Sequence, residues 1–140
     1  MAFSQYLATK ILEWVKGTTF ASALSNVYVS IHTGDPGTAG TSNDVTSNVT
    51  GTANRVAISS AAFSVVGAAS GGGFQITNTG TVQLTTNAAN VSTRTISHFG
   101  LWDAQTGGNF LASGALTTSV DVQTGDTVQF NIGAMAVRVV

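Results

Sequence analysis

After Gly17 the chain becomes a succession of short apolar segments separated by turn sequences, and this pattern limits the possible folds more than any other feature. The turns are SGGG, NTG, QTGGN, QTGD and IGA. The segments rich in alternating β-formers are 27–33, 55–59, 62–66, 73–77, 81–85, 92–103, 109–117, 119–123, 126–132 and 135–140. Short strands spaced roughly 8–12 residues apart predict an all-β, jelly-roll-like antiparallel sandwich. The absence of a second long helical pattern after Gly17 argues against an alternating β-α architecture.

The first residues follow a different period. Tyr6, Leu7, Ile11, Trp14 and Val15 recur at helical spacing, which predicts one short amphipathic N-terminal helix within 1–17. Ser4 is a suitable N-cap and Gly17 a suitable C-terminal stop. We therefore expect an N-terminal helix at 1–17 and a single β-sandwich domain at 18–140, with a long polar loop at 34–54 that holds the only proline.

Alternation within the strands predicts which side chains form the core. In the segment SHFGLWD, Phe99 and Leu101 share one face, whereas Trp102 lies on the opposite, outer face with His98 and Gly100. An exposed tryptophan suits a protein partner. The predicted core consists of Phe63, Phe74, Leu84, Phe99, Leu101, Leu111, Val128 and Phe130.

The low charge of the chain indicates that part of its surface is covered in an assembly. Only 8% of the residues are charged and the formal net charge is −1, whereas soluble monomers carry far more surface charge. The five basic residues are scattered, so we expect no nucleic-acid partner. The N-terminal segment has no apolar run long enough for a membrane span, so we expect no membrane partner. The chain has no cysteine, so it has neither disulfides nor thiolate metal ligands.

Two histidine–acid pairs are the best candidates for chemistry. His32 precedes Asp35, and His98 precedes Asp103; together they could ligate a metal or serve acid–base catalysis in a small metal-dependent hydrolase. Turn formation explains the same residues, because Asp35-Pro36-Gly37 is a typical turn sequence. No catalytic motif of recognised spacing is present. We interpret this stretch as a strand followed by a turn, and predict no enzyme activity, no catalytic or metal site and no cofactor.

Three segments give the chain a family resemblance. They are YVSIHTGDPG, ISHFGLWDAQTGGNFLASGAL and TGDTVQFNIGAMAVRV. They are similar to an LHTGDPG-like strand end, a THFGIWDAATGGNLL-like hairpin and a GDTVSF…GALTVTL-like closing segment. The chain thereby resembles a family of small tailed-phage virion proteins that are often labelled tail fibre proteins. Among small all-β phage proteins of this size, it looks most like a capsid cement, or decoration, protein.

This resemblance implies a structural role. We expect a cement protein that binds the outer surface of the mature phage capsid, bridges neighbouring capsomers and reaches the virion by assembly in the host cytoplasm. Its partners would be the major capsid protein and other copies of itself, as a homodimer or homotrimer. The alternative is a tail fibre or tail-tip module that binds a host surface receptor. The predicted partner contacts are Tyr6, Ile11, Trp14, Asp35, Pro36 and Trp102.

Overall fold

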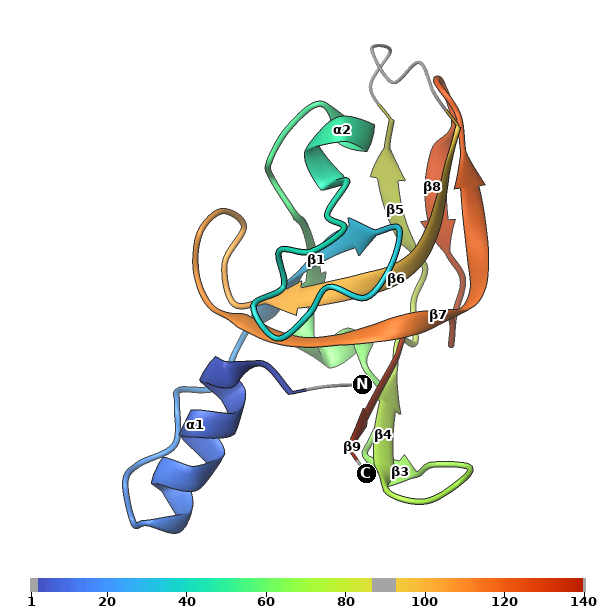
Figure 1. Cartoon of the computed structure of the whole chain (residues 1–140). Coiled ribbons are helices and arrows are strands. Elements are labelled where there is room, and N and C mark those ends of the chain that lie inside the picture. The colour runs from blue at the N-terminus through green and yellow to red at the C-terminus, as the bar shows by residue number, and fades with distance from the viewer. Residues whose placement is uncertain (1–2, 87–92, 140) are drawn as a thin grey trace.

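Antiparallel β-strands form most of the chain (Figure 1). The structure is a computed structural model that describes residues 3–86 and 93–139. Its elements are α1 (Gln5–Val15), β1 (Asn26–His32), α2 (Thr46–Thr50), β2 (Val56–Ser59), the 3-10 turn η1 (Ser60–Ala62), β3 (Gly67–Ala68), β4 (Phe74–Thr77), β5 (Val82–Thr85), β6 (Arg94–Trp102), β7 (Phe110–Val122), β8 (Thr127–Phe130) and β9 (Ala136–Val139). Residue 92 of the predicted strand 92–103 and residue 140 of 135–140 lie outside the described residues.

The strands pair in three sheets, ordered β2-β1-β6-β7, β3-β4-β9 and β5-β8. Every one of these pairings is antiparallel, and β6 and β7 pair along most of their length. The predicted all-β sandwich with one short N-terminal helix is therefore confirmed.

The inner faces of the strands meet in one hydrophobic core. Val29 and Ile31 of β1, Phe99 of β6 and Phe130 of β8 are all fully buried there. Five of the predicted core residues are confirmed as buried: Leu84, Phe99, Leu101, Val128 and Phe130. Phe63 and Leu111 are partly buried and pack against the same cluster.

Phe74 was predicted in the core and this prediction is wrong, since its side chain is 62% exposed. It lies at the end of β4 opposite Val139 of β9, and Ile76 lies opposite Val137 on the same face. Alternation correctly places Phe74 and Ile76 on one face. That face extends past the edge of the core, so only its inner pair, Ile76 and Val137, is partly covered.

The predicted N-terminal helix is confirmed as α1. The Ser4 hydroxyl accepts a hydrogen bond from the Leu7 amide at 3.0 Å, which is an N-cap. Gly17 follows the helix with φ +91°, a conformation that favours glycine. α1 has no fully buried residue, and it extends away from the strands (Figure 1).

Three segments differ from their predicted form. The predicted strand 62–66 is instead the end of η1 followed by extended chain, in which Val65 and Val66 are exposed. The segments 109–117 and 119–123 form the single strand β7, because no turn-forming residue separates them. The predicted loop 34–54 contains the short helix α2, whose residue Val49 is buried in the core.

Candidate functional site

A buried polar network covers the outer face of β1 and β6. The Trp102 indole nitrogen donates to the Ser30 hydroxyl at 2.9 Å, and the Ser30 hydroxyl lies 2.7 Å from Nε2 of His32. Nδ1 of His32 lies 2.8 Å from the carbonyl oxygen of Ser42. Ser30 and His32 are fully buried. The network therefore joins β1, β6 and the segment before α2.

The hydrogen-bond partners determine the state of His32. A carbonyl oxygen can only accept and an indole N–H can only donate. His32 therefore carries its proton on Nδ1 and donates to Ser42, while Ser30 accepts from Trp102 and donates to Nε2. Burial lowers the pKa of His32, an effect only partly opposed by the hydrogen bond to Ser42 and by the charge of Asp44. His32 is thus a neutral histidine whose two ring nitrogens are both occupied by hydrogen bonds.

Arg55 completes this face of the molecule. Its guanidinium carbon lies 3.6 Å from the centre of the Trp102 ring, a cation–π contact. Nη1 of Arg55 donates to the carbonyls of Ala104 and Gly107 at 2.9 and 2.8 Å. Arg55 therefore holds the hairpin between β6 and β7 against the network.

The prediction that Trp102 is an exposed partner contact is wrong, because its side chain is only 7% exposed. It does lie on the outer face of β6, as alternation predicted, but Arg55 and the Phe110 ring cover that face. Pro36 is also buried, whereas Asp35 is exposed and its carboxylate accepts from the Gly37 amide at 2.8 Å. The segment 34–44 thus closes over its own sheet.

The histidine–acid pairs do not converge on a metal. Asp103 accepts hydrogen bonds from the backbone and side chain of Asn109, and so organises the hairpin turn. His32 lies opposite His98 in the β1–β6 register. Within residues 3–86 and 93–139, no cluster of three or more His, Asp or Glu side chains is suitably arranged for a metal ion.

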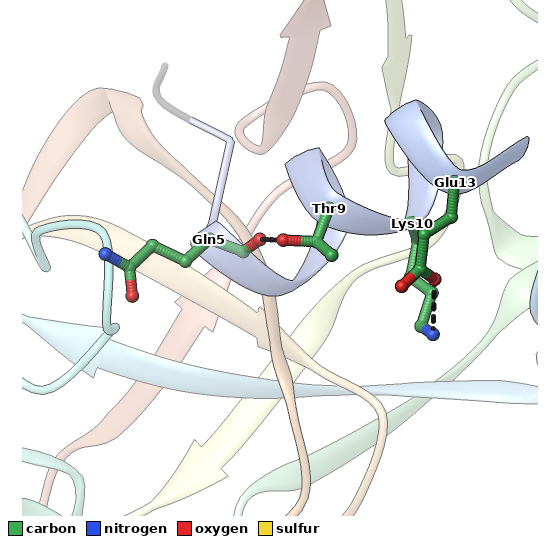
Figure 2. Close-up of polar contacts among 4 residues, drawn as sticks. All are labelled: Gln5, Thr9, Lys10 and Glu13. Atoms are coloured by element: carbon green, nitrogen blue, oxygen red, sulfur yellow. Dashed lines mark hydrogen bonds and ion pairs between the residues drawn. The ribbon is translucent and has the colours of Figure 1, made fainter. Parts of the chain in front are cut away.

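The three predicted contacts on α1 lie on a helix whose first residues adjoin the network. The Gln5 amide donates to the Thr38 carbonyl at 3.4 Å, and Tyr6 and Trp102 line the same small pocket. Tyr6 and Ile11 are half-buried, and Trp14 is 61% exposed with its ring in an edge-to-face contact with Phe20. Figure 2 shows the polar side of the helix, where Lys10 pairs with Glu13 at 2.9 Å and Thr9 donates to the Gln5 carbonyl at 2.8 Å.

A groove of about 690 Å³ runs beside α1, and we call it the α1 groove. It is lined by α1 and the segment 20–24, by Val27, Leu101 and Leu111, and by Phe63, Ile76 and Val137. Most of the lining is apolar, and Lys10 and Asp103 are its charged members. The groove therefore suits a largely nonpolar ligand or protein segment. None of the helices among the described residues has the length and apolar character needed to cross a membrane.

The comparisons with known proteins bear on this architecture. A family model described as podophage GP4 fiber I protein gp80 matches residues 2–138. The chain belongs to this family. The match takes in α1, the polar network and the α1 groove, and it identifies the chain as a structural virion protein of a phage. A comparison with curated proteins gives no match.

Membership of the podophage fibre family confirms the prediction that the chain is a small phage virion protein. The narrower prediction of a capsid cement protein remains a prediction. The sequence analysis did not assign a role to two residues of the network, Ser30 and Arg55. Ser30 lies between two β-formers in a strand with no visible special feature. Arg55 had a weak signal, since it is a single cation directly before a predicted strand in a chain with few charges.

Proposed function

We propose that the chain is a structural subunit of a podophage fibre. The observation that carries this proposal is the match of the fibre family model across residues 2–138, which includes the helix as well as the strands. The same proposal gives the chain a position in the phage tail and a role in attaching the virion to its host. Other copies of the chain and neighbouring virion proteins are its proposed partners.

The arrangement of polar groups supports a structural role without catalysis. Both ring nitrogens of His32 are occupied by hydrogen bonds. Asp35 and Asp103 accept hydrogen bonds from their own turns, and Arg55 is engaged by two carbonyls and an indole ring. These groups hold the backbone in place and leave little capacity for acid–base chemistry on a substrate.

Capsid cement is the second candidate function. A small body with 8% charged residues and an open apolar groove suits many copies packed on a larger protein surface. In this proposal each copy binds the major capsid protein on the outside of the mature head, and links between copies multiply modest single contacts. The two candidates differ in where the protein lies on the virion.

Labelling of intact virions separates them. Gold-conjugated antibodies against the purified chain would be imaged on the phage by electron microscopy, with virions from an unrelated phage as control. Label confined to the tail supports the fibre subunit. Label distributed over the head overturns that proposal in favour of cement, and virions without label contradict both.

A further inference from the structure

One side of α1 is apolar and only partly covered by the rest of the chain, since Ala8 and Ile11 are half-buried. Ala8, Ile11, Leu12 and Val15 recur at i, i+3, i+4 and i+7, and Trp14 lies beside them; we call these five residues the α1 stripe. Leu12 is 65% exposed, Val15 is 73% exposed and no stripe residue is buried. Helices in proteins owe most of their stability to packing of such a side. At Leu12 and Val15 this helix lacks such packing.

The helix contacts its own chain through a different edge. Tyr6, Leu7 and Lys10 line the α1 groove, whereas the stripe residues do not. Thr9 and Glu13 lie on the polar side seen in Figure 2. The stripe therefore cannot enter the groove of its own chain while the Tyr6 edge occupies that position.

The α1 groove forms a matching open surface at the same end of the molecule. Ile76 and Val137 line it, and the next pair on that face, Phe74 and Val139, continues the apolar surface outward. Phe74 and Val139 are both exposed. α1 and the β4–β9 pair lie at the same end of the body in Figure 1, with α1 projecting past the strands.

We propose that the α1 stripe of one copy docks in the α1 groove of a second copy. An amphipathic helix docks in an apolar groove through anchor residues at i, i+3, i+4 and i+7. Ala8, Ile11, Leu12 and Val15 have this spacing. The docked helix keeps Thr9 and Glu13 in water. The occupant is a second copy because each chain presents both apolar surfaces, the exposed part of the stripe and the groove.

The area is sufficient for a specific contact. The exposed fractions of Leu12, Trp14 and Val15 amount to about two fully exposed large side chains, on the order of 400 Å² at about 150–250 Å² each. With the groove surface included and the contact made in both directions, a pair of copies buries on the order of 1,200 Å². This is the lower limit of a standard stable interface. The inference deepens the proposed assembly of several copies and holds for a position on the tail or on the head.

A matched pair of lysine substitutions tests the contact on the purified full chain. Leu12→Lys alters the stripe, and Ile132→Lys is the control, since Ile132 is 67% exposed and lines a separate small pocket formed by β7, β8 and the turn after β8. Lysine is compatible with the last turns of a helix, and circular dichroism checks that both variants fold. Self-association is measured by sedimentation equilibrium over a wide concentration range.

We expect the unmodified chain and Ile132→Lys to associate, and the dissociation constant of Leu12→Lys to rise at least about tenfold. An unmodified chain that stays monomeric at high concentration overturns the proposal. Equal weakening of self-association by both substitutions overturns it as well. Because this assay uses no virion, its failure is distinct from a failure of the labelling test.

Cross-linking tests the partner surface, and the absence of cysteine makes the background clean. Leu12→Cys and Ile76→Cys chains are oxidised separately and as a mixture. A disulfide-linked pair that forms preferentially in the mixture supports the helix in the groove. Preferential linkage of Leu12→Cys to itself means that two α1 helices pack together, and it overturns the proposal.

Discussion

At the scale of single residues, Ser30 has the most demanding position in the chain. Its hydroxyl accepts from Trp102 and lies within hydrogen-bond distance of His32, and all three side chains are buried. One hydroxyl thus provides a partner for two buried polar groups from different strands. Buried polar groups without hydrogen-bond partners destabilise the fold. The Ser30 hydroxyl therefore links β1 to β6.

Ser30→Ala is expected to destabilise the chain by about 1–3 kcal/mol, because the Trp102 N–H and His32 Nε2 lose their partner in a buried position. Urea unfolding followed by circular dichroism measures the change in free energy of unfolding. Ser119→Ala is the control, since Ser119 is an exposed residue of β7. A loss no larger for Ser30→Ala than for the control would contradict the described network.

His32 makes stability depend on pH. Burial lowers its pKa in the folded chain below the ordinary value of 6.5, so below about pH 6.5 the unfolded chain binds the proton more readily than the folded one. Stability contributed by neutral His32 is present above that pH and is lost as the pH falls. The slope from this one group is at most about 1.4 kcal/mol per pH unit.

The measurement is urea unfolding between pH 7.5 and 5. We expect the unmodified chain to lose stability below about pH 6.5, and His32→Gln to show a smaller loss over the same interval. An identical pH dependence in both proteins would exclude His32 as its source. His98→Gln serves as the control for a general effect of removing an imidazole.

At the scale of elements, the secondary structure of a segment is predicted well when residues close to it in sequence determine that structure. α1 is such a case, because Ser4 caps it and Gly17 ends it. β6 and β7 are also local, since a hairpin organised by Asp103 joins them. The predicted helix and hairpin therefore needed no knowledge of the remaining chain.

The segment 34–44 could not be predicted in the same way. Its polar, glycine-rich sequence indicated an open loop, yet it folds over the β-sheet, with Gly40 against the Phe110 ring and Ser42 bonded to His32. Alternation tells which face of a strand a residue occupies but not what covers that face. Trp102 was misjudged because Arg55 and Phe110 cover it, and Phe74 because no described segment covers its end of β4.

Gly40 lets this segment approach the sheet. It has φ +74°, and a Cβ atom there would overlap the Phe110 ring. Gly71 has φ +88° with open space around it, so alanine at this position measures the cost of the backbone conformation without any packing effect. We expect Gly71→Ala to cost about 1–2 kcal/mol and Gly40→Ala about 1–3 kcal/mol more through overpacking. Thermal unfolding compares the two variants, and equal losses would rule out the packing effect.

At the scale of the whole molecule, two neighbouring regions have opposite character. The hairpin and the segment 34–44 are closed by hydrogen bonds from Arg55 and His32. The later turns of α1 expose apolar side chains near an apolar groove. Large exposed apolar patches mark interaction sites, which supports the proposed assembly through α1.

Assembly through α1 predicts a stability that depends on protein concentration. A partner that binds only the folded chain adds stability by mass action. We expect the unfolding midpoint of the unmodified chain to rise as its concentration is increased, and that of Leu12→Lys to rise less. Differential scanning calorimetry over a hundredfold concentration range provides the measurement. A midpoint independent of concentration would contradict assembly of the folded chain.

The two tryptophans occur in opposite settings, and this gives the protein two intrinsic optical reporters. Trp102 is enclosed beneath Arg55, whereas Trp14 lies in water on α1. Under the proposed docking of α1, we expect emission from Trp14 to shift to shorter wavelength when copies associate. Emission from Trp102 is expected to shift to longer wavelength only when the body unfolds. Replacing either indole with phenylalanine leaves a single fluorophore, so association and unfolding can be followed separately without an attached dye.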